Sequence, residues 1–230
     1  MGMPDSATQF REAGREQVSL LAPIEKKLLI RMAHATPRWI DSDHLTMLGF
    51  ISMFFAGLCY ALARTNKYML LIVILWLAVN WLGDSLDGTL ARVRNRQRPR
   101  YGFYVDHITD AFGTFFLVAG IGISGYMSPL VAAGLLIVYF MLSIQTYLAT
   151  YALGTFQLSY WKFSPTELRL LLVAGNIALL YRPVASLFGY RFLLFDIGAI
   201  IGSAGMFLML IISSIRNTAA LYKDERLPPL

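Results

Sequence analysis

Six long apolar windows constrain the fold of this chain more than any other feature of its sequence. They lie at residues 45–63, 68–83, 105–124, 129–153, 166–181 and 192–215. A bilayer core about 30 Å thick takes about 20 residues of α-helix, so each window is close to the length of one membrane span. The windows at 68–83 and 166–181 are short, and we expect their helices to continue into polar surroundings. Because 57% of the 230 residues are hydrophobic and only 15% are charged, an ordinary soluble domain and a disordered chain are excluded. The sequence predicts an all-α integral membrane protein with six transmembrane helices.

Four regions follow from this pattern. Residues 1–22 lack a continuous apolar stretch and a small-residue cleavage site, so we interpret them as a cytoplasmic tail rather than a signal peptide. In residues 23–36 apolar side chains recur at helical spacing while basic side chains occupy the other faces, which is typical of an interfacial amphipathic helix. Residues 45–215 form the six-helix transmembrane domain, and residues 216–230 form a cytoplasmic C-terminal tail.

Lys and Arg are distributed unequally between the two ends of the predicted spans. Sixteen lie at the end that carries both termini and the loop after the second window, and four lie at the other end. The smaller set is Arg64, Lys67, Arg182 and Arg191. Because cytoplasmic loops are enriched in basic residues, this asymmetry predicts that both termini are cytoplasmic. The net charge of +6 is therefore mainly a topology signal, and we expect no nucleic-acid partner.

Glycines and one aspartate inside the later windows indicate how the helices pack. Glycines recur at Gly120, Gly122 and Gly125, and again at Gly198, Gly202 and Gly205. Their spacing predicts close approach between helices. Asp196 lies inside the last window, where it either pairs with another helix or faces a cavity.

Four carboxylates lie at the edge of the second and third windows. Asp84 and Asp87 are three residues apart and Asp106 and Asp110 are four apart, so each pair shares one helical face. The short connection makes the two helices neighbours, and four carboxylates facing each other would repel without a cation between them. Oxygen ligands of this kind suit Mg²⁺ or Mn²⁺. The alternative, in which the acids are solvated or pair with the arginines that follow, explains one acid better than four in register.

Small residues and an arginine accompany these acids. Gly88 follows Asp87 directly, and Ala91 and Arg92 lie one turn further on. Small side chains let a ligand approach the backbone, and an arginine can hold a phosphate. Gly102 precedes Asp106 by one turn, where a turn or cap is the alternative role. Carboxylates, small residues and arginine together indicate metal-assisted phosphoryl chemistry at the membrane surface.

This pattern resembles the signature of the CDP-alcohol phosphotransferases. Its eight fixed positions are filled, in order, by Asp84, Asp87, Gly88, Ala91, Arg92, Gly102, Asp106 and Asp110. Six spans after an amphipathic helix also fit that family, which makes residues 45–215 a catalytic domain. The resemblance implies that an alcohol hydroxyl attacks a CDP-linked alcohol and releases CMP. It also implies a homodimer.

The resemblance carries roles over to individual positions. The four aspartates would hold two metal ions, Mg²⁺ or Mn²⁺, and Asp110 is the usual candidate for the general base. Gly88 and Ala91 would line the cytidine pocket, and Gly102 would also belong to the substrate-binding residues. Arg92 would contact the diphosphate.

The branch of the family depends on further residues. The Asp106-His107 pair resembles the choline and ethanolamine phosphotransferases, in which a histidine is a candidate base for the diacylglycerol hydroxyl. His107 could equally be a helix-end histidine bound to a carbonyl. Glu167 could face a cationic head group, or it could belong to an ordinary helix cap. Thr46, in a position similar to the family's Asn-x-x-Thr entry, could touch the nucleotide or serve as a cap.

Three functions are compatible with these residues. The leading hypothesis is transfer of a phospho-alcohol from CDP-ethanolamine or CDP-choline to diacylglycerol. The partners are then the CDP-linked alcohol, diacylglycerol and the surrounding membrane lipids. The first alternative uses CDP-diacylglycerol as donor and a small polar alcohol as acceptor, for which Arg169 is the candidate ligand of a phosphorylated acceptor. A cation transporter is a remote third possibility, because it explains the carboxylates but not the spacing of Gly88, Ala91 and Arg92.

Overall fold

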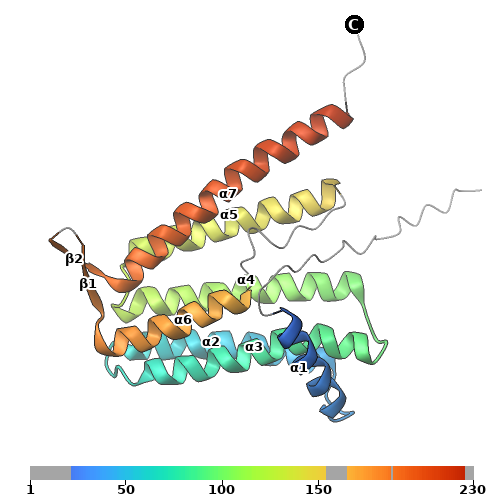
Figure 1. The fold of residues 1–230 in the computed structure, drawn as a ribbon, viewed down its shortest axis with the longest axis horizontal. Coiled ribbons are helices and arrows are strands. Elements are labelled where there is room, and N and C mark those ends of the chain that lie inside the picture. The colour runs from blue at the N-terminus through green and yellow to red at the C-terminus, as the bar shows by residue number, and fades with distance from the viewer. Residues whose placement is uncertain (1–21, 154–164, 188, 226–230) are drawn as a thin grey trace, which may run out of the picture.

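The computed structural model describes residues 22–153, 165–187 and 189–225 as a bundle of helices with one short hairpin (Figure 1). The elements are α1 (Ala22–Ala35), α2 (Ser42–Ala63), α3 (Met69–Val93), α4 (Pro99–Ser124), α5 (Pro129–Leu153), α6 (Pro165–Tyr181), β1 (Val184–Leu187), β2 (Tyr190–Leu193) and α7 (Leu194–Asp224). The prediction of an all-α membrane protein is confirmed, with the two four-residue strands as a small addition.

Five of the described helices, α2, α3, α4, α5 and α7, are long and apolar enough to cross a membrane. Helix α6 has 17 residues, which at 1.5 Å per residue is about 26 Å and slightly less than a bilayer core. It packs beside α3 and runs from the hairpin end toward the middle of the bundle (Figure 1). The chain is therefore a multi-pass integral membrane protein, and the count of six spans stays a prediction.

The helix ends follow the local chemistry of the sequence. Asp41 is the N-cap of α2, and its backbone N–H donates to His44 Nδ1 at 3.1 Å. Pro99 occupies the first turn of α4, where its missing N–H costs nothing. Gly125 ends α4 with a φ of 83°, a left-handed conformation that glycine adopts without strain.

Helices α2, α3 and α4 pack closely because glycines meet backbone at their crossings. A Cβ added at Gly120 would lie 2.0 Å from the Gly57 carbonyl oxygen, and one at Gly83 would lie 2.6 Å from the Leu45 carbonyl oxygen. The predicted close approach at Gly120 is confirmed. The same prediction is wrong for Gly125, Gly198, Gly202 and Gly205 in the described residues, since a Cβ at each would meet nothing within 4 Å.

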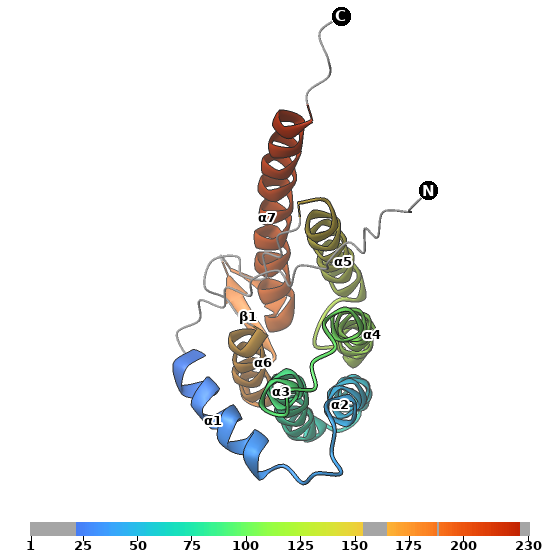
Figure 2. The same cartoon turned by 90° about the vertical axis from the view of Figure 1, so that its right-hand side faces the viewer.

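Helix α1 lies across the end of the bundle at which α3 ends and α4 begins (Figures 1 and 2). Leu29 and Ala33 are buried in a cluster with residues of α2 and α3. Glu25 accepts hydrogen bonds from Trp81 Nε1 at 2.8 Å and from Thr166 Oγ1 at 3.1 Å. The amphipathic helix is thus tied to α3 and α6 near the acidic residues.

The hairpin at the opposite end corrects the predicted start of the last span. The window was expected to begin at residue 192, but Phe192 lies in β2, paired with Ala185, and α7 begins at Leu194. The helix then continues to Asp224, well past the apolar window. Asp196 accepts hydrogen bonds from the backbone N–H of Ser128 at 2.7 Å and from its hydroxyl at 2.5 Å, so it pairs with the start of α5.

Candidate functional site

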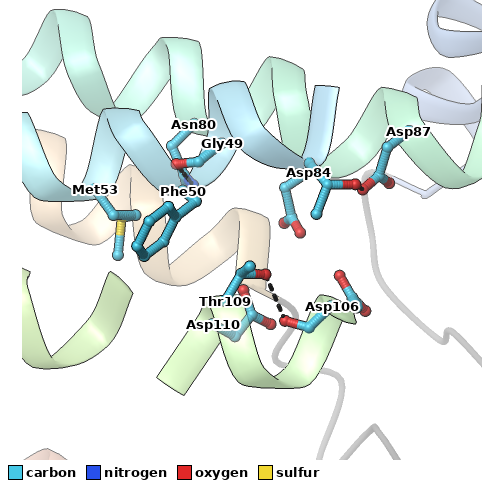
Figure 3. A pocket seen from close by; sticks show the side chains of 10 residues that line it. Gly49, Phe50, Met53, Asn80, Asp84, Asp87, Asp106, Thr109 and Asp110 are labelled. Carbon is cyan, nitrogen blue, oxygen red and sulfur yellow. Dashed lines mark hydrogen bonds between the residues drawn. The ribbon is translucent and has the colours of Figure 1, made fainter. Parts of the chain in front are cut away.

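A narrow pocket lies among α2, α3 and α4. Figure 3 shows its side chains, with the acidic groups of α3 facing those of α4. The lining residues are Thr46, Gly49, Phe50, Met53, Asn80, Asp84, Asp87, Asp106, Thr109 and Asp110. The structure therefore brings all four predicted aspartates into one pocket.

Three of these aspartates form a compact group. One carboxylate oxygen from each of Asp84, Asp106 and Asp110 lies within 4.8 Å of the other two. Three oxygens converging from two helices fit a hard divalent cation such as Mg²⁺ or Mn²⁺, which takes carboxylate ligands. The donor chemistry of this site is therefore compatible with the predicted metal ions.

Asp87 is held slightly apart by hydrogen bonds to its own surroundings. Its Oδ2 accepts from Thr46 Oγ1 at 2.7 Å, and its Oδ1 accepts from the Gly88 N–H at 2.5 Å. The Asp87 carbonyl accepts from the Ser42 hydroxyl at 3.0 Å. Thr46 thus lies in the pocket, where its observed contact is with a carboxylate, and its contact with the nucleotide stays a prediction.

Arg169 of α6 reaches the same carboxylates. Its Nη2 donates to Asp84 Oδ2 at 2.5 Å and its Nε donates to Asn80 Oδ1 at 2.8 Å. The Arg169 and Asp84 side chains are 16% and 25% exposed, so solvent screens this ion pair only in part. Asn80 is itself buried and donates to the Gly49 carbonyl at 3.0 Å.

These contacts add residues to those that the sequence motif contains. Asn80 lies one turn before Asp84, a spacing that could have drawn attention to it. Arg169 was considered only as a ligand of a phosphorylated acceptor. Its ion pair with Asp84 joins residues 85 positions apart, and no local pattern indicates such a contact.

Comparison with known proteins supports the interpretation of this site. Residues 39–213 match the model of the CDP-alcohol phosphatidyltransferases. The chain belongs to this family. No curated protein matches the chain significantly. Membership makes the chain a phospholipid head-group transferase of a family that is generally dependent on divalent metals.

The remaining family positions cluster around the cytoplasmic ends predicted for α3 and α4. Arg92 Nη2 donates to the Thr89 hydroxyl at 3.1 Å, on the last turns of α3. The Ala91 carbonyl accepts from the Arg96 N–H at 2.9 Å, which closes the end of the helix. Gly102 lies in the first turns of α4, and a Cβ there would meet nothing within 4 Å. Packing within the described residues therefore does not require a glycine at this position.

The two residues that suggested a branch of the family lie outside the described pocket wall. His107 Nδ1 is 2.6 Å from the Phe103 carbonyl oxygen, and its ring lies edge to face with Tyr147 of α5, at 5.0 Å between centroids. The carbonyl-bound alternative for His107 is thus observed. Glu167 lies in the first turn of α6, two residues before Arg169.

Proposed function

We propose that this protein transfers a substituted phosphate group from a CDP-linked alcohol to an alcohol hydroxyl and releases CMP. The convergence of Asp84, Asp106 and Asp110 within 4.8 Å, with Asp87 in the same pocket, carries the proposal. When bound there, two Mg²⁺ or Mn²⁺ ions would neutralise the diphosphate and stabilise the leaving CMP.

The roles of the side chains follow from their places in the pocket. Asp110, which lines the pocket, accepts the proton of the attacking hydroxyl. The hydroxyl oxygen then bonds to the phosphorus that carries the alcohol, while the bond from that phosphorus to CMP breaks. Thr46 orients Asp87 through its hydrogen bond.

The nucleotide is assigned to the last turns of α3, where Gly88, Ala91 and Arg92 follow the pocket residue Asp87. The guanidinium of Arg92 suits the diphosphate, because it can donate two parallel hydrogen bonds to phosphate oxygens. The open space around Gly102 leaves room for the nucleotide to approach the backbone of α4.

The leading substrates are CDP-ethanolamine or CDP-choline as donor and diacylglycerol as acceptor. The Asp106-His107 pair supports this branch, and the aromatic rings of Phe103 and Tyr147 beside His107 could contact a cationic head group. Glu167, at the start of α6, supplies a negative charge for the same head group. His107 serves as a second candidate base in this proposal.

A specific observation also favours a second candidate. The Arg169 guanidinium reaches the carboxylate group directly, and an arginine in this place suits an anionic acceptor such as a phosphorylated alcohol. In that case CDP-diacylglycerol is the donor, and His107 has a structural role through its hydrogen bond to the Phe103 carbonyl and its ring contact with Tyr147.

The active site is assigned to the cytoplasmic face of the membrane. Three parts of the chain lie toward one end of the bundle, namely helix α1, the loop that joins α3 to α4, and the C-terminal end of α7 (Figure 1). The hairpin lies at the other end. The basic excess of the sequence belongs to the first end, which supports a cytoplasmic placement of both termini. A homodimer is proposed from the family alone.

The test is CMP release from purified protein in detergent with Mg²⁺ or Mn²⁺. One arm supplies CDP-choline or CDP-ethanolamine with diacylglycerol, and the other supplies CDP-diacylglycerol with a panel of polar alcohols. Turnover in the first arm supports the leading substrates, and turnover only in the second supports the alternative. Metal-dependent turnover in neither arm, from protein that remains folded, would refute the proposed function.

A further inference from the structure

The ion pair between Arg169 and Asp84 places a fixed positive charge beside the proposed metal ligands. Asp84 contributes one oxygen to the three-carboxylate group, and its Oδ2 accepts from Arg169 at 2.5 Å. Arg169 comes from α6, whereas the carboxylates come from α3 and α4. The contact therefore depends on how α6 packs against α3.

The guanidinium is held in this position by a second anchor. Its Nε donates to Asn80 Oδ1 at 2.8 Å, and Asn80 in turn donates to the Gly49 carbonyl of α2. Asn80 is only 5% exposed, so its amide has a fixed orientation. This chain of contacts links α2, α3 and α6, and it aims Arg169 at Asp84.

A divalent cation on Asp84 and the guanidinium on the same carboxylate oppose each other. Both charges would lie within a few ångströms in a half-buried site, where charge repulsion is much stronger than in bulk water. Metal-free protein faces the opposite problem, because carboxylates left close together without a cation repel one another. Arg169 relieves that repulsion when no metal is bound.

We propose that Arg169 is a resident counter-cation, which neutralises Asp84 in the metal-free enzyme and is displaced from it when a divalent ion binds. This inference rests on the proposed function, since it takes the carboxylates as metal ligands. Displacement leaves the guanidinium beside the pocket, where it can contact an anionic phosphate of the substrate. By linkage, a substrate anion that takes Arg169 away from Asp84 strengthens metal binding, so metal and substrate load cooperatively.

The test is a Mn²⁺ titration of the purified full-length protein in detergent, followed by electron paramagnetic resonance. We expect Arg169→Gln to bind Mn²⁺ about tenfold more tightly than wild type, within the usual range of coupling between sites. Arg182→Gln is the matched control, because it removes the same charge from an exposed position just beyond the other end of α6, and it should bind like wild type. Asp106→Asn identifies the signal that belongs to the carboxylate site.

A second readout follows thermal unfolding with EDTA and with saturating Mn²⁺. Arg169→Gln should unfold at a lower temperature than wild type in EDTA, and Mn²⁺ should reduce this difference. A merely structural role for Arg169 would leave the difference unchanged by the metal. If Arg169→Gln does not fold, Arg169→Met, which keeps an unbranched apolar stem, carries the same expectations.

The outcomes separate this inference from the function on which it rests. Unchanged or weaker Mn²⁺ binding by folded Arg169→Gln, with normal binding by wild type, overturns the counter-cation role and leaves the metal site intact. If wild type shows no bound Mn²⁺ signal, or if Asp106→Asn leaves that signal unchanged, the carboxylates are not the metal site. That result overturns both the counter-cation role and the proposed metal site. Failure of both Arg169 variants to fold even with saturating Mn²⁺ shows a structural role and also overturns the inference.

Discussion

Replacing Gly120 by alanine tests how the bundle positions its catalytic helices. The added Cβ would lie 2.0 Å from the Gly57 carbonyl oxygen and 2.7 Å from Gly57 Cα, and both atoms belong to the backbone. No rotamer change can relieve a clash with backbone atoms, so α4 must move away from α2. Ordinary van der Waals contact begins at 3.4 Å, so the Cβ and the carbonyl oxygen must move apart by roughly 1.4 Å.

This separation should affect both stability and activity. Overpacking of this kind costs about 1–3 kcal/mol of unfolding free energy, and more where backbone must move. Helix α4 also carries Asp106 and Asp110, and a misplacement of about 1 Å in a catalytic group can lower the rate about 100-fold. We therefore expect Gly120→Ala to unfold at a lower temperature and to release CMP much more slowly than wild type.

The assay compares this variant with Gly198→Ala in the same detergent. A Cβ at Gly198 of α7 meets nothing within 4 Å, so the same chemical change should leave the unfolding temperature and CMP release close to wild type. Thermal unfolding followed by tryptophan fluorescence gives the stability, and CMP release gives the activity. Wild-type values for Gly120→Ala would refute the close crossing of α2 and α4.

Three further substitutions test individual side chains of the pocket. Asp106→Asn should lower CMP release on the order of 100-fold or more while the protein still folds, because one charged oxygen ligand is lost; wild-type turnover would remove the two-metal proposal. Thr46→Val, which deletes the 2.7 Å hydrogen bond to Asp87, should weaken Mn²⁺ binding about tenfold in an electron paramagnetic resonance titration, and Thr46→Ser should restore it. Arg92→Ala should raise the KM for the CDP substrate more than it lowers kcat, and steady-state kinetics with an unchanged KM would contradict contact with the diphosphate.

Local spacing predicted much of the acidic site because helical geometry is local. Residues three or four apart share a face of any α-helix, so the pairs Asp84–Asp87 and Asp106–Asp110 could be placed before the fold was known. The observed pocket contains all four. The same rule could not say which carboxylates converge, and it is Asp87 that lies outside the compact group.

The later part of the chain was harder to predict. The hairpin of β1 and β2 escaped the hydropathy pattern, because its residues are too few and too mixed in polarity to differ from a span boundary. Gly198 and its neighbours have the spacing of packed small residues, yet they face open space in the described structure. Spacing shows that an approach is possible, while a partner helix decides whether it occurs.

The sequence by itself determined that this protein lies in a membrane, that its fold is helical, and which chemistry its acidic segment offers. Apolar length and residue type are properties of each segment alone, so no knowledge of the fold is needed to read them. Only the tertiary structure decided that Thr46 binds Asp87, that Gly57 meets Gly120, and that Arg169 binds Asp84. These contacts join helices far apart in the sequence, and they depend on how the shapes of several helices fit together at once.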